Sequence, residues 1–329
     1  MLPFKIVFDD SCRLPIGNHI FPADKYARTQ QRLLELGAAA PEDFVSGPAA
    51  TDEDIMLVHT RMWVDKLAEG QLTVREELEL EVPYSLELVK AFWQITGNSM
   101  LAANLALRDG CCVHLGGGFH HAFAGHGEGF CVIHDVAVAI RALQRDGKIA
   151  RAMVIDTDVH QGNGTATIFG DDKLRPFPRP AWSAEIVGPS SSAKVKQGGS
   201  RDVFTISLHQ ETNYPEWKPE SSIDVNLPDG INDAEYLDWL RSTLKLAQKR
   251  FQPELICHLS GADAYQHDQL GGLGLTIEGL RRRDAMVYEF ARDLGCPVMV
   301  TLAGGYAEKL EDTVAIHANT VLVGIEVFR

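Results

Sequence analysis

The sequence predicts an α/β fold, an open parallel sheet with helices on both faces. Short apolar runs rich in β-branched residues recur along the chain and predict buried strands. These runs are Lys5–Phe8, Cys112–Leu115, Ala152–Ile155, Val203–Leu208, Leu255–Leu259 and Val298–Leu302. Longer amphipathic segments alternate with them, several after a Ser, Asp or Thr that can cap a helix. These segments are Asp24–Leu36, Ser85–Leu107, Val136–Arg145, Asp233–Arg250, Thr276–Leu294 and Ala307–Val323. Such alternation is typical of βαβ units.

Two segments depart from this alternation. Residues Asp43–Glu81 are rich in charge and helix-like, and we expect an excursion near the start of the sheet. Residues Lys173–Arg201 carry prolines, a serine run and a glycine pair without sustained periodicity, which predicts a long surface loop. Because a parallel α/β domain of this length can be one unit, we expect residues 1–329 to form a single domain with a loop insertion at 173–201.

The composition indicates a folded, acidic protein. Hydrophobic residues make up 45% and charged residues 23% of the 329 positions, which excludes a largely disordered chain. The net charge of −14 disfavours direct nucleic-acid binding and favours cationic substrates such as polyamines or lysine-rich tails, although a solvated acidic surface is the simpler explanation. Six cysteines without a CxxC pair indicate reduced thiols. With no apolar stretch long enough to span a bilayer, we expect a cytoplasmic protein.

Reactive side chains follow four of the predicted strands. In open parallel sheets ligands bind outside the carboxyl ends of the strands, so these side chains should meet in one site. Their positions are His120 and His121 in GGGFHH, Asp156, Asp158, His160 and Asn163 in DTDVHQGNG, Asp263 in SGADAYQHD, and Tyr306 in AGGY.

Three of these residues predict a metal site. Asp158 and His160 are two apart in an extended segment, so they point to the same side and can share one cation. Asp263, from another strand end, makes a third ligand. Three protein ligands with an open fourth position are typical of catalytic zinc, and the two carboxylates leave iron(II) open as an alternative.

The remaining side chains predict amide hydrolysis. This reaction needs a deprotonated water and a protonated leaving amine, and the tandem His120 and His121 can supply both functions near neutral pH. Asp156 could orient one ring and Asn163 the other. Tyr306, after two glycines, could donate its hydroxyl to the oxyanion. The glycine runs at 116–118 and 271–274 match no phosphate-binding fingerprint and indicate backbone room beside a buried site.

Five ordered motifs carry a resemblance to a known family. They are GGGFHHAFAGHGEGFC, DTDVHQGNGTATIF, SLH at Ser207–His209, SGADAYQHDQLGGL and LAGGY. In order and spacing they resemble the zinc-dependent histone deacetylases and the acetoin-utilisation proteins, and the class IV histone deacetylases most closely. The resemblance covers nearly the whole chain except Lys173–Arg201, and it implies the arginase/deacetylase type of open parallel sheet.

The resemblance also implies roles for individual residues. Asp158, His160 and Asp263 would hold the metal, His120 and His121 would be the acid/base pair, and Tyr306 would polarise the acyl carbonyl. A narrow tunnel for an acyl-lysine chain is implied, with walls at Gly129, Phe130, Tyr214, Gly304 and Gly305. A structural potassium ion is implied near Asp156, Asp158, His160, Ser207 and Leu208.

Several positions depart from the family pattern. Asn163 stands where many relatives have aspartate, so the acid/base division between the two histidines stays open. Gln161 replaces a frequent second histidine, and His134 stands where asparagine is usual. The insertion closely follows Asp171 and Asp172, where relatives can bind a second monovalent ion, so that site is in doubt.

We therefore expect a metal-dependent amidohydrolase that removes acetyl or longer acyl groups from lysine side chains. An acylpolyamine deacetylase and a non-catalytic acyl-lysine binding module are the alternatives; retention of the ligands, the histidines and Tyr306 disfavours the latter. A ureohydrolase with two bridged metals is disfavoured because the position two residues after Asp263 is Tyr265 and offers no carboxylate. The sequence leaves the substrate, the acyl length, the native metal and the oligomeric state open.

Overall fold

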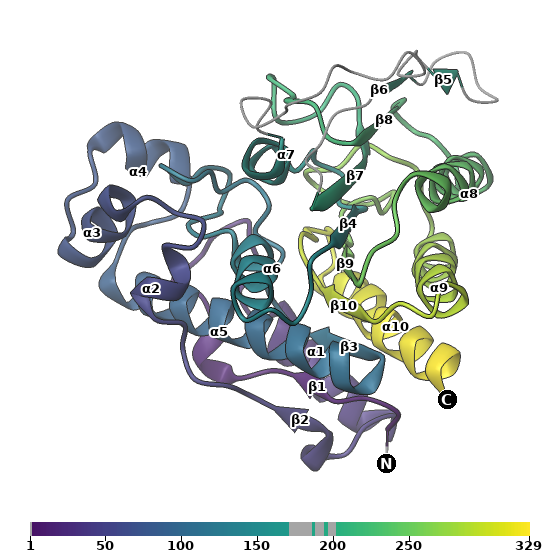
Figure 1. Ribbon diagram of the computed structural model, residues 1–329, viewed down its shortest axis with the longest axis horizontal. Coiled ribbons are helices and arrows are strands. Elements are labelled where there is room, and N and C mark those ends of the chain that lie inside the picture. Colours follow the sequence, from purple (N-terminus) through teal and green to yellow (C-terminus); the bar gives the residue numbers. More distant parts are fainter. Residues whose placement is uncertain (1, 171–185, 188–193, 197–201) are drawn as a thin grey trace.

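A central sheet organises the computed structural model, which describes residues 2–170, 186–187, 194–196 and 202–329. Within these residues ten strands form one sheet (Figure 1). Their order is β2 (Phe44–Val45), β1 (Ile6–Val7), β3 (Cys111–His114), β10 (Val298–Thr301), β9 (Leu255–Leu259), β4 (Ala152–Asp156), β7 (Val203–Gln210), β8 (Ile223–Leu227), β6 (Lys194–Lys196) and β5 (Ile186–Val187). All pairs from β2 to β8 are parallel, and β6 and β5 extend the edge in antiparallel orientation. The predicted parallel α/β fold is confirmed.

Helices cover both faces of this sheet. The α-helices are α1 (Lys25–Glu35), α2 (Asp52–Ile55), α3 (Arg61–Glu69), α4 (Val74–Leu80), α5 (Leu86–Asp109), α6 (Asp135–Arg145), α7 (Asn163–Phe169), α8 (Asp233–Arg250), α9 (Ile277–Asp293) and α10 (Leu310–Phe328). Two short 3-10 helices lie at Asp10–Cys12 and Pro41–Asp43. Figure 1 shows α8, α9 and α10 gathered on one side of the strands and α5 with α6 on another.

Alternation along the strands divides the core into two layers. In β10, Val298 and Val300 pack in the layer that includes α1, α8, α9 and α10, whereas Met299 packs in the layer that includes α6 and the second half of α5. Successive side chains of a strand point to opposite faces, and both faces here are covered. The central strands β3, β4, β9 and β10 are therefore mainly apolar, and this apolar character makes them visible in the sequence.

Capping explains where several helices begin. Ser85 accepts a hydrogen bond from the Leu88 N–H (3.0 Å) at the start of α5, and Thr276 accepts one from the Gly279 N–H (2.9 Å) at the start of α9. Gly110 ends α5 in the left-handed conformation, with φ 85°, and β3 begins at the next residue. A helix of 24 residues thus leads directly into a central strand.

The structure adds elements that the sequence pattern did not predict. The strands β2 and β8 and the helix α7 were not expected, and the charged excursion at 43–81 contains the short helices α2, α3 and α4. The predicted loop insertion at 173–201 lies outside the described residues, apart from the backbone of β5 and β6, and Asp171 and Asp172 lie outside them as well. Among the described residues, no helix combines the length and apolar character that a membrane span requires.

Candidate functional site

The side chains singled out in the sequence converge on one pocket at the carboxyl ends of β3, β4, β9 and β10. Its volume is about 200 Å³. Six aromatic side chains line it: Phe21, Tyr26, Phe119, Phe130, Tyr214 and Tyr306. His120, His121, Asp158 and His160 line it too. Apolar walls around a few convergent polar groups are typical of a small-molecule site.

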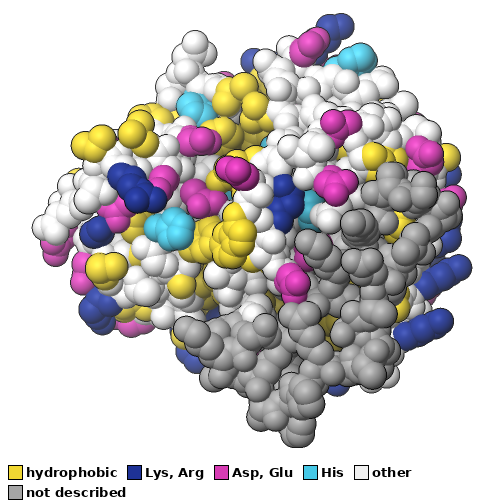
Figure 2. All heavy atoms as spheres, turned by 90° about the horizontal axis from the view of Figure 1, so that it is seen from above, with side chains coloured by type: hydrophobic (Ala, Val, Ile, Leu, Met, Phe, Trp, Pro, Cys, Tyr) yellow, Lys and Arg dark blue, Asp and Glu magenta, His cyan; other side chains and the backbone are white. Residues whose placement is uncertain are grey.

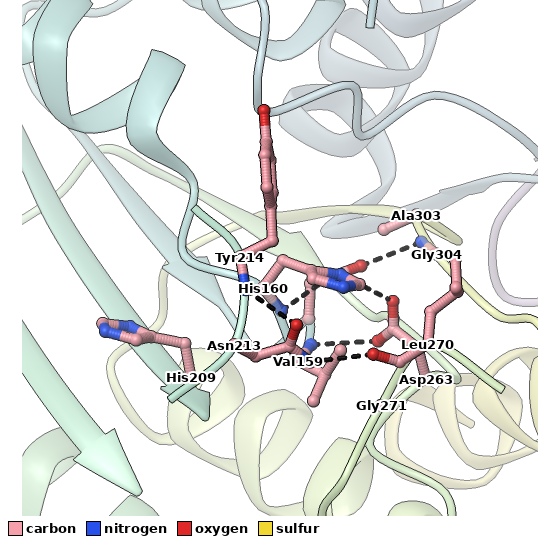
Figure 3. A network of polar contacts seen from close by, with 12 residues as sticks. Val159, His160, His209, Asn213, Tyr214, Asp263, Leu270, Gly271, Ala303 and Gly304 are labelled. Atoms are coloured by element: carbon pink, nitrogen blue, oxygen red, sulfur yellow. Dashed lines mark hydrogen bonds and ion pairs between the residues drawn. The ribbon is translucent and has the colours of Figure 1, made fainter. Parts of the chain in front are cut away.

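Asp158, His160 and Asp263 lie together at the base of this pocket. One potential ligand atom from each falls within 4.8 Å of the other two. The Nδ1 atom of His160 lies 3.1 Å from Asp158 Oδ1 and 3.5 Å from Asp263 Oδ2 (Figure 3). All three side chains are buried. Two oxygens and one nitrogen, all within reach of a common point, form a ligand set suited to a divalent cation.

Two observations show that these residues fit one such ion. Asp263 Oδ2 is buried without a hydrogen-bond partner among the described residues, and a buried carboxylate oxygen left in this state is costly unless it binds a cation. A Cβ atom at Gly304 would lie 2.0 Å from this same oxygen, so a side chain there would fill the space. Glycine at position 304 therefore keeps the ligand oxygen accessible.

Backbone groups from neighbouring strand ends hold the two carboxylates. The Val159 N–H donates to Asp263 Oδ1 (2.9 Å), and the Gly304 N–H donates to Asp158 Oδ2 (2.9 Å) (Figure 3). Each aspartate is thus oriented by a loop other than its own. The loops after β4, β9 and β10 must all be in place before the ligand set exists.

The electrostatics of the cluster require a positive charge. Burial and the neighbouring Asp158 raise the pKa of Asp263 to about 7. Burial lowers the pKa of His160, but the neighbouring carboxylates of Asp158 and Asp263 outweigh this and raise it to about 10. The two carboxylates thus favour the protonated form of the His160 imidazole. A bound divalent cation would supply the positive charge instead, and the histidine could then act as a neutral ligand.

The two adjacent histidines have different partners. His120 Nδ1 lies 2.7 Å from Asp156 Oδ2, and His121 Nδ1 lies 2.8 Å from Asn163 Oδ1. Burial lowers the pKa of His120, but the charges of Asp156 and Asp158 raise it to a net value of about 8. Burial and the neighbouring His120 hold the pKa of His121 well below its usual range. Such a separation of two titratable groups is the pattern of an acid and a base.

Tyr306 enters the pocket from the turn after β10. Its backbone N–H donates to Asp268 Oδ2 (2.7 Å), and its ring lies edge-on to Phe21 and Phe130. Burial raises the pKa of its hydroxyl well above the usual value, so the group stays protonated and can donate a hydrogen bond. Lys25 and Tyr26 from α1 both donate to the Ala303 carbonyl, at 2.9 Å and 3.0 Å, and so support this turn.

The structure brings most of the expected tunnel residues together. Gly129, Phe130, Tyr214 and Gly304 line the pocket. Gly305 is not among the described residues that line it; a Cβ there would lie 2.9 Å from both Ala262 and Thr313. Its φ of 149° instead serves the turn that carries Tyr306.

The residues expected around potassium also lie close together. Asp156 in β4 is paired with Ser207 in β7, next to Leu208. Ser207 Oγ lies 2.9 Å from His209 Nδ1. The ion was expected to bind mainly backbone carbonyls, and these side-chain contacts do not test that expectation. The potassium site therefore stays a prediction.

Arg283 supports the metal-ligand loops, a role that the sequence did not reveal. It is fully buried on α9, where its Nη1 donates to the Gly261 carbonyl (2.6 Å) and lies 3.3 Å from the Thr157 carbonyl. Its Nη2 lies 2.8 Å from Asp284 Oδ1. The guanidinium therefore joins the loop that carries Asp158 to the loop that carries Asp263. An arginine on an amphipathic helix gives no sequence signal that it faces inward.

Two residues at which the sequence departs from the family pattern form hydrogen bonds with neighbouring loops. Gln161 donates to the Pro219 carbonyl (2.6 Å) and to Asp224 Oδ1 (3.1 Å). His134 Nε2 lies 2.8 Å from Thr165 Oγ1, and burial holds the pKa of this histidine well below its usual range. Both side chains are buried and stabilise the loops behind the pocket.

Comparison with known proteins shows the family to which the chain belongs. Residues 19–321 match the family model described as the histone deacetylase domain. The chain belongs to the histone deacetylase family.

Three similar relatives come from a cyanobacterium, a plant and a firmicute. An uncharacterized protein of Picosynechococcus is 33% identical over 96% of both chains. Histone deacetylase 2 of Arabidopsis thaliana is 28% identical over 90% of this chain and 72% of the relative. The acetoin utilization protein AcuC of Staphylococcus aureus is 26% identical over 80% and 66%.

Solved structures of histone deacetylase homologues share the fold. A homologue from Aquifex aeolicus superposes with a TM-score of 0.75 at 22% identity, covering 97% of this chain and 83% of that chain. A homologue complexed with SAHA superposes with a TM-score of 0.74 at 24% identity, covering 99% and 84%. The arginase/deacetylase arrangement expected from the motifs is confirmed.

We expect Arg283→Met to weaken divalent-metal affinity by roughly 10- to 100-fold, because the two ligand loops lose their shared donor. The measurement is Zn²⁺ affinity by competition with a chromogenic chelator, with thermal unfolding recorded in parallel. Arg281→Met is the matched control, because Arg281 lies on the same helix but pairs at the surface with Glu326. If a folded Arg283→Met protein bound zinc as tightly as the control, Arg283 would have no role in the metal site.

Proposed function

We propose that this protein is a zinc-dependent amidohydrolase that removes acetyl or longer acyl groups from lysine side chains of peptides or proteins. The observation that carries the proposal is the convergence of the Asp158, His160 and Asp263 ligand set with two histidines and a tyrosine in one pocket. Membership of the histone deacetylase family supports it. The homologue complexed with SAHA shows that a related fold binds this molecule. Iron(II) remains the alternative metal, since two of three ligands are carboxylates.

A metal held by these three residues would lower the pKa of a water molecule and polarise the acyl carbonyl. His121 is suited to accept the proton of the attacking water, because its Nδ1 faces the uncharged Asn163 amide and burial keeps the ring neutral. His120 is suited to stay protonated beside Asp156, to stabilise negative charge and supply a proton to the leaving amine. The carboxylate partner of His120 suits the acid function, and the amide partner of His121 suits the base function.

Tyr306 is suited to stabilise the oxyanion. Its hydroxyl stays protonated because burial raises its pKa, and its ring is fixed between Phe21 and Phe130. A preorganised donor of this kind acts where charge develops, in a pocket with little water. The aromatic walls and the small residues Gly117, Gly118 and Ala303 give the pocket an apolar interior for an acyl chain.

Acylated polyamines are the second substrate class. Glu81 lines the pocket, and the net charge of −14 favours a substrate that carries additional positive charge. Acidic side chains are scattered among apolar ones over the face drawn in Figure 2. A lysine peptide with neighbouring basic residues would share this advantage, so direct comparison of the two substrates separates the classes.

We extend the proposal to four further features, of which the first two depend on the family resemblance and the last two on the sequence itself. These are placement in the class IV branch, a structural potassium ion near Asp156 and Ser207, a single domain over residues 1–329 and a cytoplasmic location. All six cysteines are free and buried, which suits a reducing compartment.

Hydrolysis of a substrate panel tests the proposed function. We expect the purified protein to release acyl groups from lysine peptides that carry chains from acetyl to myristoyl, and a hydroxamate to inhibit the release. N-acetylated polyamines form the second arm. Faster turnover of the polyamines would transfer the proposal to that class, whereas a folded, metal-loaded protein inert on every member would favour a non-catalytic binding module.

Two substitutions should separate catalysis from metal binding. Tyr306→Phe should lower kcat by roughly 100- to 1,000-fold with unchanged metal content, because one oxyanion donor is lost. Asp263→Ala should instead lower the bound metal itself, measured by elemental analysis after dialysis. Full activity in both variants would mean that the site is elsewhere.

A further inference from the structure

Glu128 lies behind the histidine pair, in the loop between β3 and α6, and no role follows for it from the metal chemistry. Its Oε1 accepts hydrogen bonds from Asn163 Nδ2 (2.5 Å) and from the Tyr214 hydroxyl (2.7 Å). Its Oε2 lies 3.4 Å from His126 Nε2. Burial raises the pKa of Glu128, but the hydrogen bonds from His126, Tyr214 and Asn163 lower it to a net value below the usual one. The side chain is therefore an ionised acceptor at neutral pH.

This carboxylate fixes which way the Asn163 amide points. An ionised carboxylate only accepts hydrogen bonds, so the amide atom that faces Glu128 must be the NH₂ group. The other amide atom accepts the Gly164 N–H at 3.0 Å, as only the oxygen can. Two independent partners thus assign Asn163 Oδ1 to the side of His121 and remove the usual ambiguity of amide orientation.

The amide orientation in turn fixes the tautomer of His121. Asn163 Oδ1 lies 2.8 Å from His121 Nδ1, and an oxygen that can only accept requires a hydrogen on that nitrogen. In a neutral imidazole the hydrogen on Nδ1 leaves Nε2 with the lone pair. Nε2 is then the nitrogen of His121 that can act as a base, as the proposed function needs.

Tyr214 connects the same carboxylate to the wall of the pocket. Its hydroxyl shares Glu128 Oε1 with Asn163, and its ring lies edge-on to His121 with centroids 4.9 Å apart. A Cβ at Gly129 would lie 2.9 Å from His121 and 3.1 Å from Tyr214, so these groups are closely packed. Glu128 therefore holds the tunnel wall and the histidine partner in one fixed arrangement.

We propose that Glu128 is a positioning residue that, through Asn163, holds His121 in the Nδ1–H tautomer and links it to the tunnel wall at Tyr214. The inference rests on the proposed function, because it assigns His121 to the reaction. It also gives a physical reason for the amide at position 163. An aspartate there would place a second carboxylate 2.5 Å from Glu128, and two carboxylates in contact cannot both be ionised.

Exchanging the carboxylate at position 128 with the amide at position 163 tests this arrangement. Glu128→Gln removes the charge, and Asn163→Asp creates a carboxylate contact; we expect each to lower kcat by roughly 10- to 100-fold. The double variant Glu128→Gln with Asn163→Asp restores one carboxylate and one amide, with the carboxylate accepting from both His121 and the new amide. The restored tautomer should raise kcat at alkaline pH at least about threefold above that of either single variant, while the new carboxylate raises the pKa of His121 and moves the acid limb of the pH–rate profile to higher pH.

The control is His126→Gln, because His126 stacks on Phe123 and approaches the other oxygen of Glu128, not the one that Asn163 and Tyr214 share; it should change kcat less than about twofold. Metal content and thermal unfolding of every variant identify losses that arise from misfolding. A residue with only a structural role would give additive losses, so a double variant at least as impaired as the single variants would overturn the inference. Recovery in the double variant supports it.

A second readout does not depend on activity. Long-range ¹H–¹⁵N spectra of zinc-loaded protein with ¹⁵N-labelled histidine report which ring nitrogen carries hydrogen, and His121→Gln identifies the signal. The inference predicts Nδ1–H in the wild type and a mixed population in Glu128→Gln. An Nε2–H wild-type ring would contradict it. If the wild type is inert on every substrate yet shows Nδ1–H, the proposed function fails while the positioning by Glu128 stands.

Discussion

Two buried aspartates that face the same point are the constraint on which the rest of the site depends. Asp158 and Asp263 repel each other in a region that water does not reach, and this arrangement is costly without a cation. Backbone N–H groups from Val159 and Gly304 hold one oxygen of each in place, and Asp263 Oδ2 has no hydrogen-bond partner among the described residues, so it is left for a metal. The donor to each aspartate belongs to a different loop from the aspartate itself. The ligand set therefore exists only when β4, β9 and β10 are in register.

The second half of the site depends on a difference between two neighbouring rings. His120 faces a carboxylate and His121 faces an amide, although the two residues are adjacent in the chain. The charge of Asp156 raises the pKa of His120, whereas burial and the neighbouring His120 keep His121 neutral, so one pair of identical side chains can serve two functions at one pH. In the proposed arrangement Glu128 contributes to this difference from outside the pocket lining. Its carboxylate orients the Asn163 amide, and the amide oxygen faces His121.

The sequence predicted the fold, and the structure brings the three expected ligand residues together, for reasons that are local. The strand at Leu255–Leu259 and the helix at Asp233–Arg250 were predicted with their observed bounds, because the first is mainly apolar and the second has a consistent helical period. Asp158 and His160 were singled out from their spacing of two in an expected extended segment; the structure brings both side chains to one point, although residues 158–160 form a bend after β4. The roles of the site residues stay predictions until they are tested.

What the sequence did not predict depends on contacts between distant residues. Strand β8 carries Asp224 and Asn226, polar residues that are buried because Gln161 and His209 reach them from other segments. Helix α7 begins with Asn163 and Gly164 and carries two threonines, residues of low helix propensity, so its pattern is weak. Arg283 and Glu128 likewise gain their roles only through partners that the fold supplies.

Metal titration of the activity tests the central claim most directly. The protein is stripped with a chelator, shown by circular dichroism to remain folded, and assayed for acyl-lysine hydrolysis as Zn²⁺ is added back. The account predicts activity that is absent without metal and saturates at about one ion per chain, because three protein ligands bind one metal. Hydrolysis that survives complete metal removal, or that needs two ions per chain, would contradict it.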